Sequence, residues 1–126
     1  MKYFAKVKKL DPSIEEEVTL EIQGIEFTGF ATICPYVIEV GKIYPVTVGF
    51  TILDDIIMNE ARDPRKGLEY LASGYRYCIR GVLNETSIDA GIIIVDDDEY
   101  FEDYQYLVNK FVEFQVDRMT VEFLQK

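Results

Sequence analysis

The residues that could do chemistry in this chain are charged or aromatic, because the sequence contains no histidine. That absence removes Ser-His-Asp and Cys-His pairs and every imidazole metal ligand. Gly41-Lys42 resembles the end of a phosphate-binding loop, but Tyr36 stands where the earlier glycine is needed and Ile43 where Ser or Thr is needed. The sequence therefore predicts a protein that is not an enzyme and uses no cofactor. A carboxylate-based hydrolase is the weakest alternative, because it requires a deep cleft.

An acidic and aromatic run near the C-terminal third is the first candidate site. It lacks the spacing and the central glycine of a calcium loop, so no metal is assigned to it. Tyrosines give protein interfaces a large contact area with a polar end. The alternatives are the solvated start of a helix and a divalent cation site. We predict a partner-binding surface made of Asp96, Asp97, Asp98, Glu99, Tyr100, Glu102, Asp103 and Tyr106.

A basic cluster forms the second candidate site. Tyrosines lie among its members, and small barrels bind single strands by stacking bases on aromatic rings inside a positive groove. Alternation argues against this use, because Tyr75 and Tyr77 share a face with Ile79 and are expected in the core. The bland interpretation pairs the arginines with nearby acids such as Asp89. The alternative anion-binding site consists of Arg62, Arg65, Lys66, Arg76 and Arg80.

The overall charge favours a basic partner. The 126 residues include 23 acidic and 13 basic side chains, a formal net charge of −10. Nucleic acids attract proteins mainly through Lys and Arg contacts to phosphate, so nucleic acid is not the expected partner. A basic protein would be attracted by the same field, as in an inhibitor or immunity-type protein that masks a cationic site on its target. The bland alternative is that the acidity only keeps the protein soluble.

The two cysteines and the apolar runs bear on location. Cys34 and Cys78 form no CxxC motif, so neither a zinc site nor a redox pair is indicated, although a disulfide between them stays open. The longest aliphatic run, residues 92–95, is far too short to span a bilayer. We expect a cytoplasmic protein with no membrane partner, and the sequence leaves its oligomeric state open.

Alternation with a period of two dominates the chain. Five apolar residues alternate with smaller residues between Tyr44 and Ile52, which predicts a half-buried strand. One hairpin is expected around Gln23-Gly24, with Ile22 facing Ile25. A second is expected near residue 84, where a two-residue loop pairs Arg80 with Asp89 and a four-residue loop does not.

Three further segments are predicted between residues 54 and 124. Apolar residues change from even positions at 112–116 to odd positions at 119–123, so Asp117-Arg118 must be a bulge or a corner. A short helix with an aspartate N-cap is expected over 98–107. One helical turn is expected around 68–72.

The order of these elements resembles an OB-type small barrel, which has five strands and a helix between the third and the fourth. The resemblance covers about residues 43–124, and it makes the N-terminal strand and hairpin at 2–33 an addition to the barrel. A β-sandwich with one helix would give a similar pattern. We therefore predict a mainly β chain forming one domain over residues 1–126, either a small antiparallel OB-like barrel or a sandwich. The resemblance implies oligonucleotide or anion binding as the alternative function.

Overall fold

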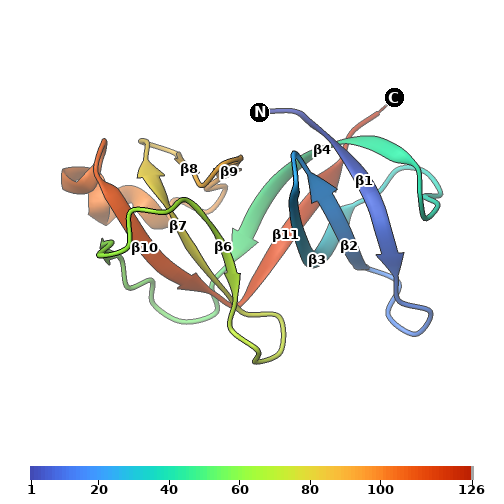
Figure 1. Cartoon of the computed structure of the whole chain (residues 1–126), viewed down its shortest axis with the longest axis horizontal. Helices are drawn as coiled ribbons and strands as arrows, with labels where there is room; N and C mark the ends of the chain where they lie inside the picture. The colour runs from blue at the N-terminus through green and yellow to red at the C-terminus, as the bar shows by residue number, and fades with distance from the viewer. Residues whose placement is uncertain (126) are drawn as a thin grey trace.

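The computed structural model describes residues 1–125 and consists mostly of β-strands (Figure 1). This confirms the predicted mainly β chain with one short helix. The strands are β1 (Tyr3–Leu10), β2 (Glu17–Ile22), β3 (Ile25–Ile33), β4 (Ile43–Thr51), β5 (Asn59–Glu60), β6 (Gly67–Tyr70), β7 (Tyr77–Leu83), β8 (Ser87–Asp89), β9 (Ile93–Val95), β10 (Phe111–Val116) and β11 (Arg118–Phe123). A 3-10 helix, η1 (Tyr100–Leu107), lies between β9 and β10.

Five strands close into a barrel in the order β1, β2, β3, β11, β4. Neighbouring strands are antiparallel except β3 and β11, which run parallel. The barrel was expected over residues 43–124, with residues 2–33 outside it, and this placement is wrong. The N-terminal strands supply three of the five barrel strands. Alternation shows that a segment is a strand but not which distant strand it pairs with, and the pairing of β3 with β11 joins opposite ends of the chain.

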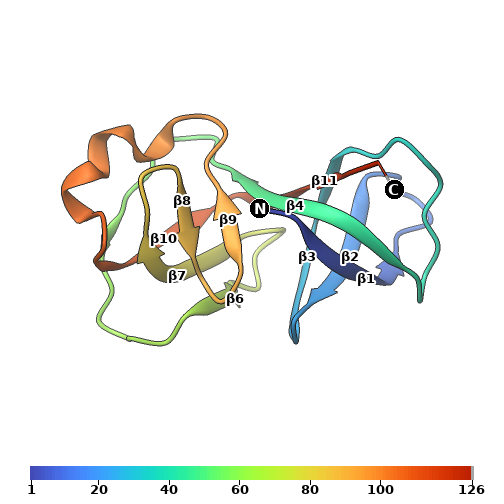
Figure 2. The same ribbon diagram turned by 90° about the horizontal axis from the view of Figure 1, so that it is seen from above.

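The remaining strands form a second sheet beside the barrel (Figure 2). Its order is β5, β10, β7, β8, β9. Strands β6 and β8 share the edge of β7 that faces away from β10: β6 pairs with residues 77–80, and β8 pairs with residues 82 and 83. The helix η1 lies at the end of the molecule farthest from the barrel (Figure 2). No helix in the described part of the chain is long and apolar enough to cross a membrane.

Apolar side chains of the barrel and the second sheet join in one buried cluster. The end of β4 makes the connection, because the Phe50 side chain packs against two rings of the second half. Its ring centroid lies 5.6 Å from that of Phe101 and 5.4 Å from that of Phe114. Two hydrogen bonds also cross the junction. Ile93 N–H donates to the hydroxyl of Tyr3 at 2.7 Å, and Thr28 N–H donates to the hydroxyl of Tyr77 at 2.9 Å.

The local predictions of register hold well. Ile22 pairs with Ile25 around a two-residue turn whose residues both have positive φ, 51° at Gln23 and 84° at Gly24. In the later hairpin Leu83 pairs with Ile88, which is the register of the four-residue loop, so Arg80 does not face Asp89. The predicted corner falls at Asp117, between β10 and β11.

Two smaller expectations are wrong. Residues 67–70 form strand β6 instead of a helical turn, because pairing with β7 satisfies their backbone groups. The residue before η1 is Glu99 in the left-handed region, and it makes no side-chain cap. Asp96, five residues ahead of Phe101, accepts the Phe101 N–H at 2.7 Å instead.

The close approach of the backbone at the end of β8 to Gly81 of β7 gives a stability prediction. A Cβ built on Gly81 would lie 2.1 Å from the Asp89 carbonyl oxygen, so no side chain fits there without moving the backbone. We expect Gly81→Ala to lower the free energy of unfolding by roughly 3 kcal/mol in chemical denaturation. Gly49→Ala is the control, because its closest contact is the flexible Thr120 hydroxyl at 2.9 Å, and it should cost less. Equal stability of Gly81→Ala and wild type would contradict this close backbone contact.

Candidate functional site

A groove of about 610 Å³ lies on the outer face of the second sheet. Strands β6, β7 and β10 form its floor, and the loop of residues 52–59 forms one wall. Its lining residues are Ile52, Asp54, Asp55, Ile57, Asn59, Glu69, Leu71, Arg76, Cys78, Arg80 and residues 113–117. We refer to this feature as the acidic groove.

Strand alternation places the polar floor of the groove. Tyr77 and Ile79 of β7 turn into the core, so Cys78 and Arg80 turn toward the groove. On β10, Glu113 and Gln115 alternate with buried apolar residues in the same way. The register sets Glu113 opposite Arg80 and Gln115 opposite Cys78. Two strands with an apolar inner face thus present one polar outer face.

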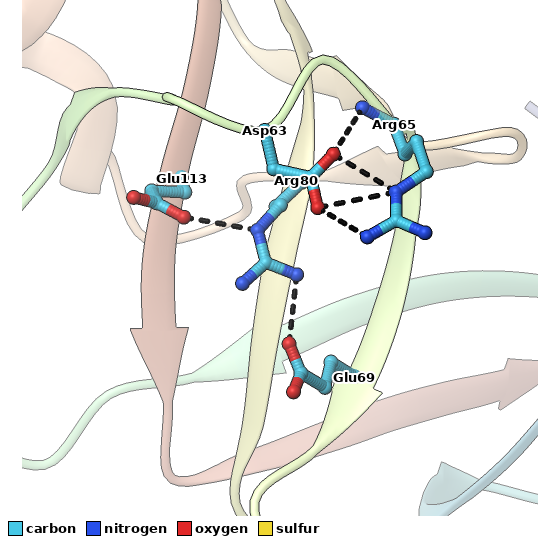
Figure 3. A network of polar contacts seen from close by, with 5 residues as sticks. All are labelled: Asp63, Arg65, Glu69, Arg80 and Glu113. Atoms are coloured by element: carbon cyan, nitrogen blue, oxygen red, sulfur yellow. Dashed lines mark hydrogen bonds and ion pairs between the residues drawn. The ribbon is translucent and has the colours of Figure 1, made fainter.

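Arg80 lies between two carboxylates on this floor (Figure 3). Its Nη1 donates to Glu69 Oε1 at 2.8 Å, and its Nε donates to Glu113 Oε2 at 2.9 Å. These hydrogen bonds, the one to Glu69 first, raise the pKa of Arg80, so the guanidinium is always charged. Both carboxylates hold the same guanidinium, and Arg80 therefore offers little of its charge to an incoming anion.

Hydrogen bonds from neighbouring segments hold the loop of residues 52–59, which forms the wall of the groove. The Tyr100 hydroxyl donates to the carbonyl of Ile52 at 2.8 Å, and the Tyr104 hydroxyl donates to that of Ile56 at 2.9 Å. At the other end, the Asp117 carboxylate accepts the Leu53 N–H at 2.7 Å. The helix η1 and the β10–β11 corner thus hold a loop that has little regular structure of its own.

The groove has a negative charge. Its lining contains five acidic side chains and two arginines. Arg76 lies 3.6 Å from Asp117, and Arg80 is held by Glu69 and Glu113. Asp54 and Asp55 are exposed, and neither forms an ion pair within residues 1–125. These two carboxylates are therefore open to a cation.

The predicted anion-binding cluster is brought only partly together, and most of its charges are paired. The Nε and Nη2 groups of Arg65 donate hydrogen bonds to the Asp63 carboxylate (Figure 3). These bonds lower the pKa of Asp63 to about 2. Lys66 binds Asp89 at 2.8 Å and lowers the pKa of that carboxyl group. With Arg76 and Arg80 paired as above, Arg62 is the member without an ion pair in the described chain. The arrangement matches the interpretation of these residues as structural ion pairs.

The predicted partner-binding segment is divided by the structure. Asp96 accepts hydrogen bonds from the backbone N–H groups of Asp98 and Phe101 and so stabilises the start of η1. Tyr100 donates to the carbonyl of Ile52 and so stabilises the loop of residues 52–59. Asp97 lies instead beside Gly49 of the barrel strand β4. The exposed remainder, which includes Tyr106 at 71% exposure, consists of Asp98, Glu99, Glu102, Asp103 and Tyr106. It adjoins the acidic groove through the loop that η1 holds.

Sequence reasoning missed the groove itself. Asp54, Asp55, Glu69 and Glu113 were not singled out, although β7 and β10 each show an alternating polar face. Two such faces predict a polar surface only when the two strands are known to be neighbours. Within residues 1–125 no group of three or more His, Cys, Asp or Glu residues is placed to hold a metal ion.

Comparison with known proteins gives one match. The family described as Uncharacterised conserved protein UCP019853 matches residues 1–124. The chain belongs to this family. The match takes in both the barrel and the second sheet, and every residue of the acidic groove lies within it. No curated protein and no solved structure matches the chain.

The two thiols should react at very different rates. Both cysteines are free; Cys34 is exposed, and Cys78 is buried on the groove floor. Burial raises the pKa of the Cys78 thiol, with the charge of Arg80 offsetting part of the rise. Because the thiolate is the nucleophile, an aromatic disulfide reagent at about pH 8 should label Cys34 quickly and Cys78 slowly. In Cys34→Ser only the slow phase should remain, and rapid labelling of that variant would contradict the placement of Cys78.

Proposed function

We propose that this protein is a non-enzymatic binding module that holds a basic segment of another protein in the acidic groove. The observation that carries the proposal is the pair Asp54 and Asp55, exposed on the wall of the acidic groove and free of ion pairs in the described structure. A guanidinium or ammonium group between these carboxylates would form charge-assisted hydrogen bonds.

The charge distribution supports a basic occupant. Residues 53–117 hold 15 of the 23 acidic side chains and six of the 13 basic ones. Most of the net charge of −10 therefore belongs to the second sheet and its loops. A cation approaching from this side meets an attractive field, which raises the rate of encounter.

The apolar part of the groove narrows the chemistry further. Ile57 is 72% exposed at the wall, and Leu71, directly after β6, is half-buried. In a segment with alternating cationic and apolar side chains, the apolar side chains would cover this isoleucine. The cationic side chains would then contact the carboxylates of the groove. Tyr106 and the exposed acids of 98–103 would extend the contact past the loop. A module of this kind would act as an inhibitor or immunity-type protein for a basic target.

The alternative, an OB-like module that binds an oligonucleotide or another anion, has less support. A five-stranded closed barrel fits an OB-like interpretation. However, four of the five basic residues assigned to that function are in ion pairs with carboxylates. The free thiols agree with a reducing compartment, so we propose a cytoplasmic location.

A fluorescent peptide of alternating arginine and leucine tests the proposal. Wild-type protein should bind it, and Asp54→Asn combined with Asp55→Asn should weaken binding about five-fold, since each exposed pair contributes ~0.5 kcal/mol. Anisotropy titrations at low salt measure the change. The control replaces Glu15 and Glu16 by glutamine, because these exposed acids of the barrel carry the same charge outside the groove. Equal weakening in both double variants would show that only the net charge matters, and the groove would lose its assignment.

Salt gives a second test of the same interaction. The ion pairs that Asp54 and Asp55 would form with the peptide are exposed, so their attraction is screened as the Debye length falls from ~14 Å near 50 mM to about 4 Å near 500 mM salt. Added salt should therefore lower the affinity of wild-type protein for the peptide more steeply than that of the Asp54→Asn, Asp55→Asn variant, so that the two affinities converge. Binding that does not change with salt would remove the electrostatic basis of the proposal.

A further inference from the structure

A second charged surface lies on the outer wall of the barrel. Residues 1–10 contain four lysines and no acidic residue, in a chain whose net charge is −10. In β1 the outward positions are occupied by Phe4, Lys6 and Lys8, which alternate with buried Tyr3, Ala5 and Val7. The neighbouring strand β4 adds Ile43, whose Cα pairs with that of Lys6. We refer to Lys2, Phe4, Lys6, Lys8, Val40, Lys42 and Ile43 as the lysine face.

Apolar side chains are exposed between these lysines. Phe4 is 63% exposed, Ile43 62% and Val40 58%. The backbone holds them together, because Gly41 N–H donates to the Val7 carbonyl at 2.8 Å and Val7 N–H donates to the Lys42 carbonyl at 3.0 Å. Lys2 lies over the Phe4 ring, 5.3 Å from its centroid. A strand wall that combines exposed apolar groups with lysines has the composition of a surface that lies on lipid.

The positive charge of this face is only partly neutralised. Lys8 lies 3.9 Å from Glu21, and Lys42 lies 2.5 Å from Glu39, with all four side chains well exposed. Lys2, Lys6 and Lys9 form no ion pair within residues 1–125. A second copy docking through the same face would bring like charges together, so symmetric self-association is disfavoured. The face requires an anionic partner.

The expectation of no membrane partner rested on the lack of a spanning segment, which does not bear on surface binding, and we propose that the lysine face binds the surface of an anionic membrane. Lysines near such a surface are attracted to acidic lipid headgroups, and the apolar side chains between them can enter the headgroup layer. Phe4 and Ile43 would lose exposed apolar surface on entering the headgroup layer, and a phosphate backbone or an acidic peptide covers such surface less well than lipid. The acidic second sheet is repelled by the same membrane. The charge asymmetry would therefore orient the molecule with the barrel on the lipid and the acidic groove toward the solution.

Cosedimentation with lipid vesicles tests this proposal. We expect the protein to bind phosphatidylcholine vesicles containing roughly one-third phosphatidylserine, and to bind pure phosphatidylcholine at least about five-fold less. Lys6→Gln combined with Lys8→Gln should reduce binding to the anionic vesicles several-fold. Arg62→Gln combined with Lys110→Gln is the matched control, because it removes two exposed positive charges from the second sheet. Equal loss in the two double variants, or no binding to anionic vesicles, would overturn the proposal.

A tryptophan reporter tests the apolar contact directly. The chain contains no tryptophan, so Phe4→Trp introduces a single indole at a position exposed enough to accept it. Its emission should shift to shorter wavelength on anionic vesicles, since the indole enters a less polar layer. Leu53→Trp, 70% exposed in the wild-type chain and outside the lysine face, should not shift. An unshifted Phe4→Trp spectrum, or a shift produced equally by a single-stranded oligonucleotide or a polyglutamate chain without lipid, would overturn the membrane assignment.

Discussion

The structure depends on the corner at Asp117, where one continuous C-terminal run passes from the second sheet into the barrel. Side chains of a strand alternate in direction, so β10 and β11 can both bury apolar residues only if one residue between them breaks the alternation. Asp117 does this and is held in place on three sides. Its N–H donates to the Thr51 carbonyl at 2.9 Å, its carboxylate accepts the Leu53 N–H at 2.7 Å, and Arg76 lies 3.6 Å away. These contacts bind the corner to the end of β4, the other strand whose residues reach both cores.

The contact between Asp117 and the end of β4 also positions the wall of the acidic groove. Because the chain leaves β4 beside Asp117, the loop of residues 52–59 must begin next to β10, and the tyrosines of η1 then hold it over the sheet. The wall of the groove therefore follows from the way two cores are joined. Arg80 on the floor neutralises Glu69 of β6 and Glu113 of β10, which would otherwise repel each other across β7. The loop acids have no such structural partner in the described chain, and this difference separates residues that stabilise the fold from residues open to a ligand.

The sequence was most informative where the physics is local. The pairing of Ile22 with Ile25 depends on a two-residue turn, and the corner at Asp117 depends on the positions of the apolar residues around it, so both could be predicted. The barrel could not be placed, because β11 reaches its neighbours β3 and β4 from the far end of the chain and alternation is the same for every partner. The strand at 67–70 was missed for a similar reason, since its hydrogen bonds come from β7. The groove floor depends on the pairing of β7 with β6 and with the distant strand β10, so its acids could not be selected from the other carboxylates of an acidic chain.

The rigid connection between the two halves also determines how their charges act. An acidic groove and a lysine face on flexibly linked units would attract each other and become neutralised within one molecule. Here β4 and the β10–β11 run continue from one half into the other, and hydrogen bonds such as that from the Thr28 N–H to the Tyr77 hydroxyl fix the junction. The lysines of β1 belong to the wall of a closed barrel and cannot turn toward β10 in the second sheet. At physiological salt the Debye length is ~8 Å, so charges farther apart than this act independently. A net charge of −10 therefore describes neither surface, and each binds according to its own local charge.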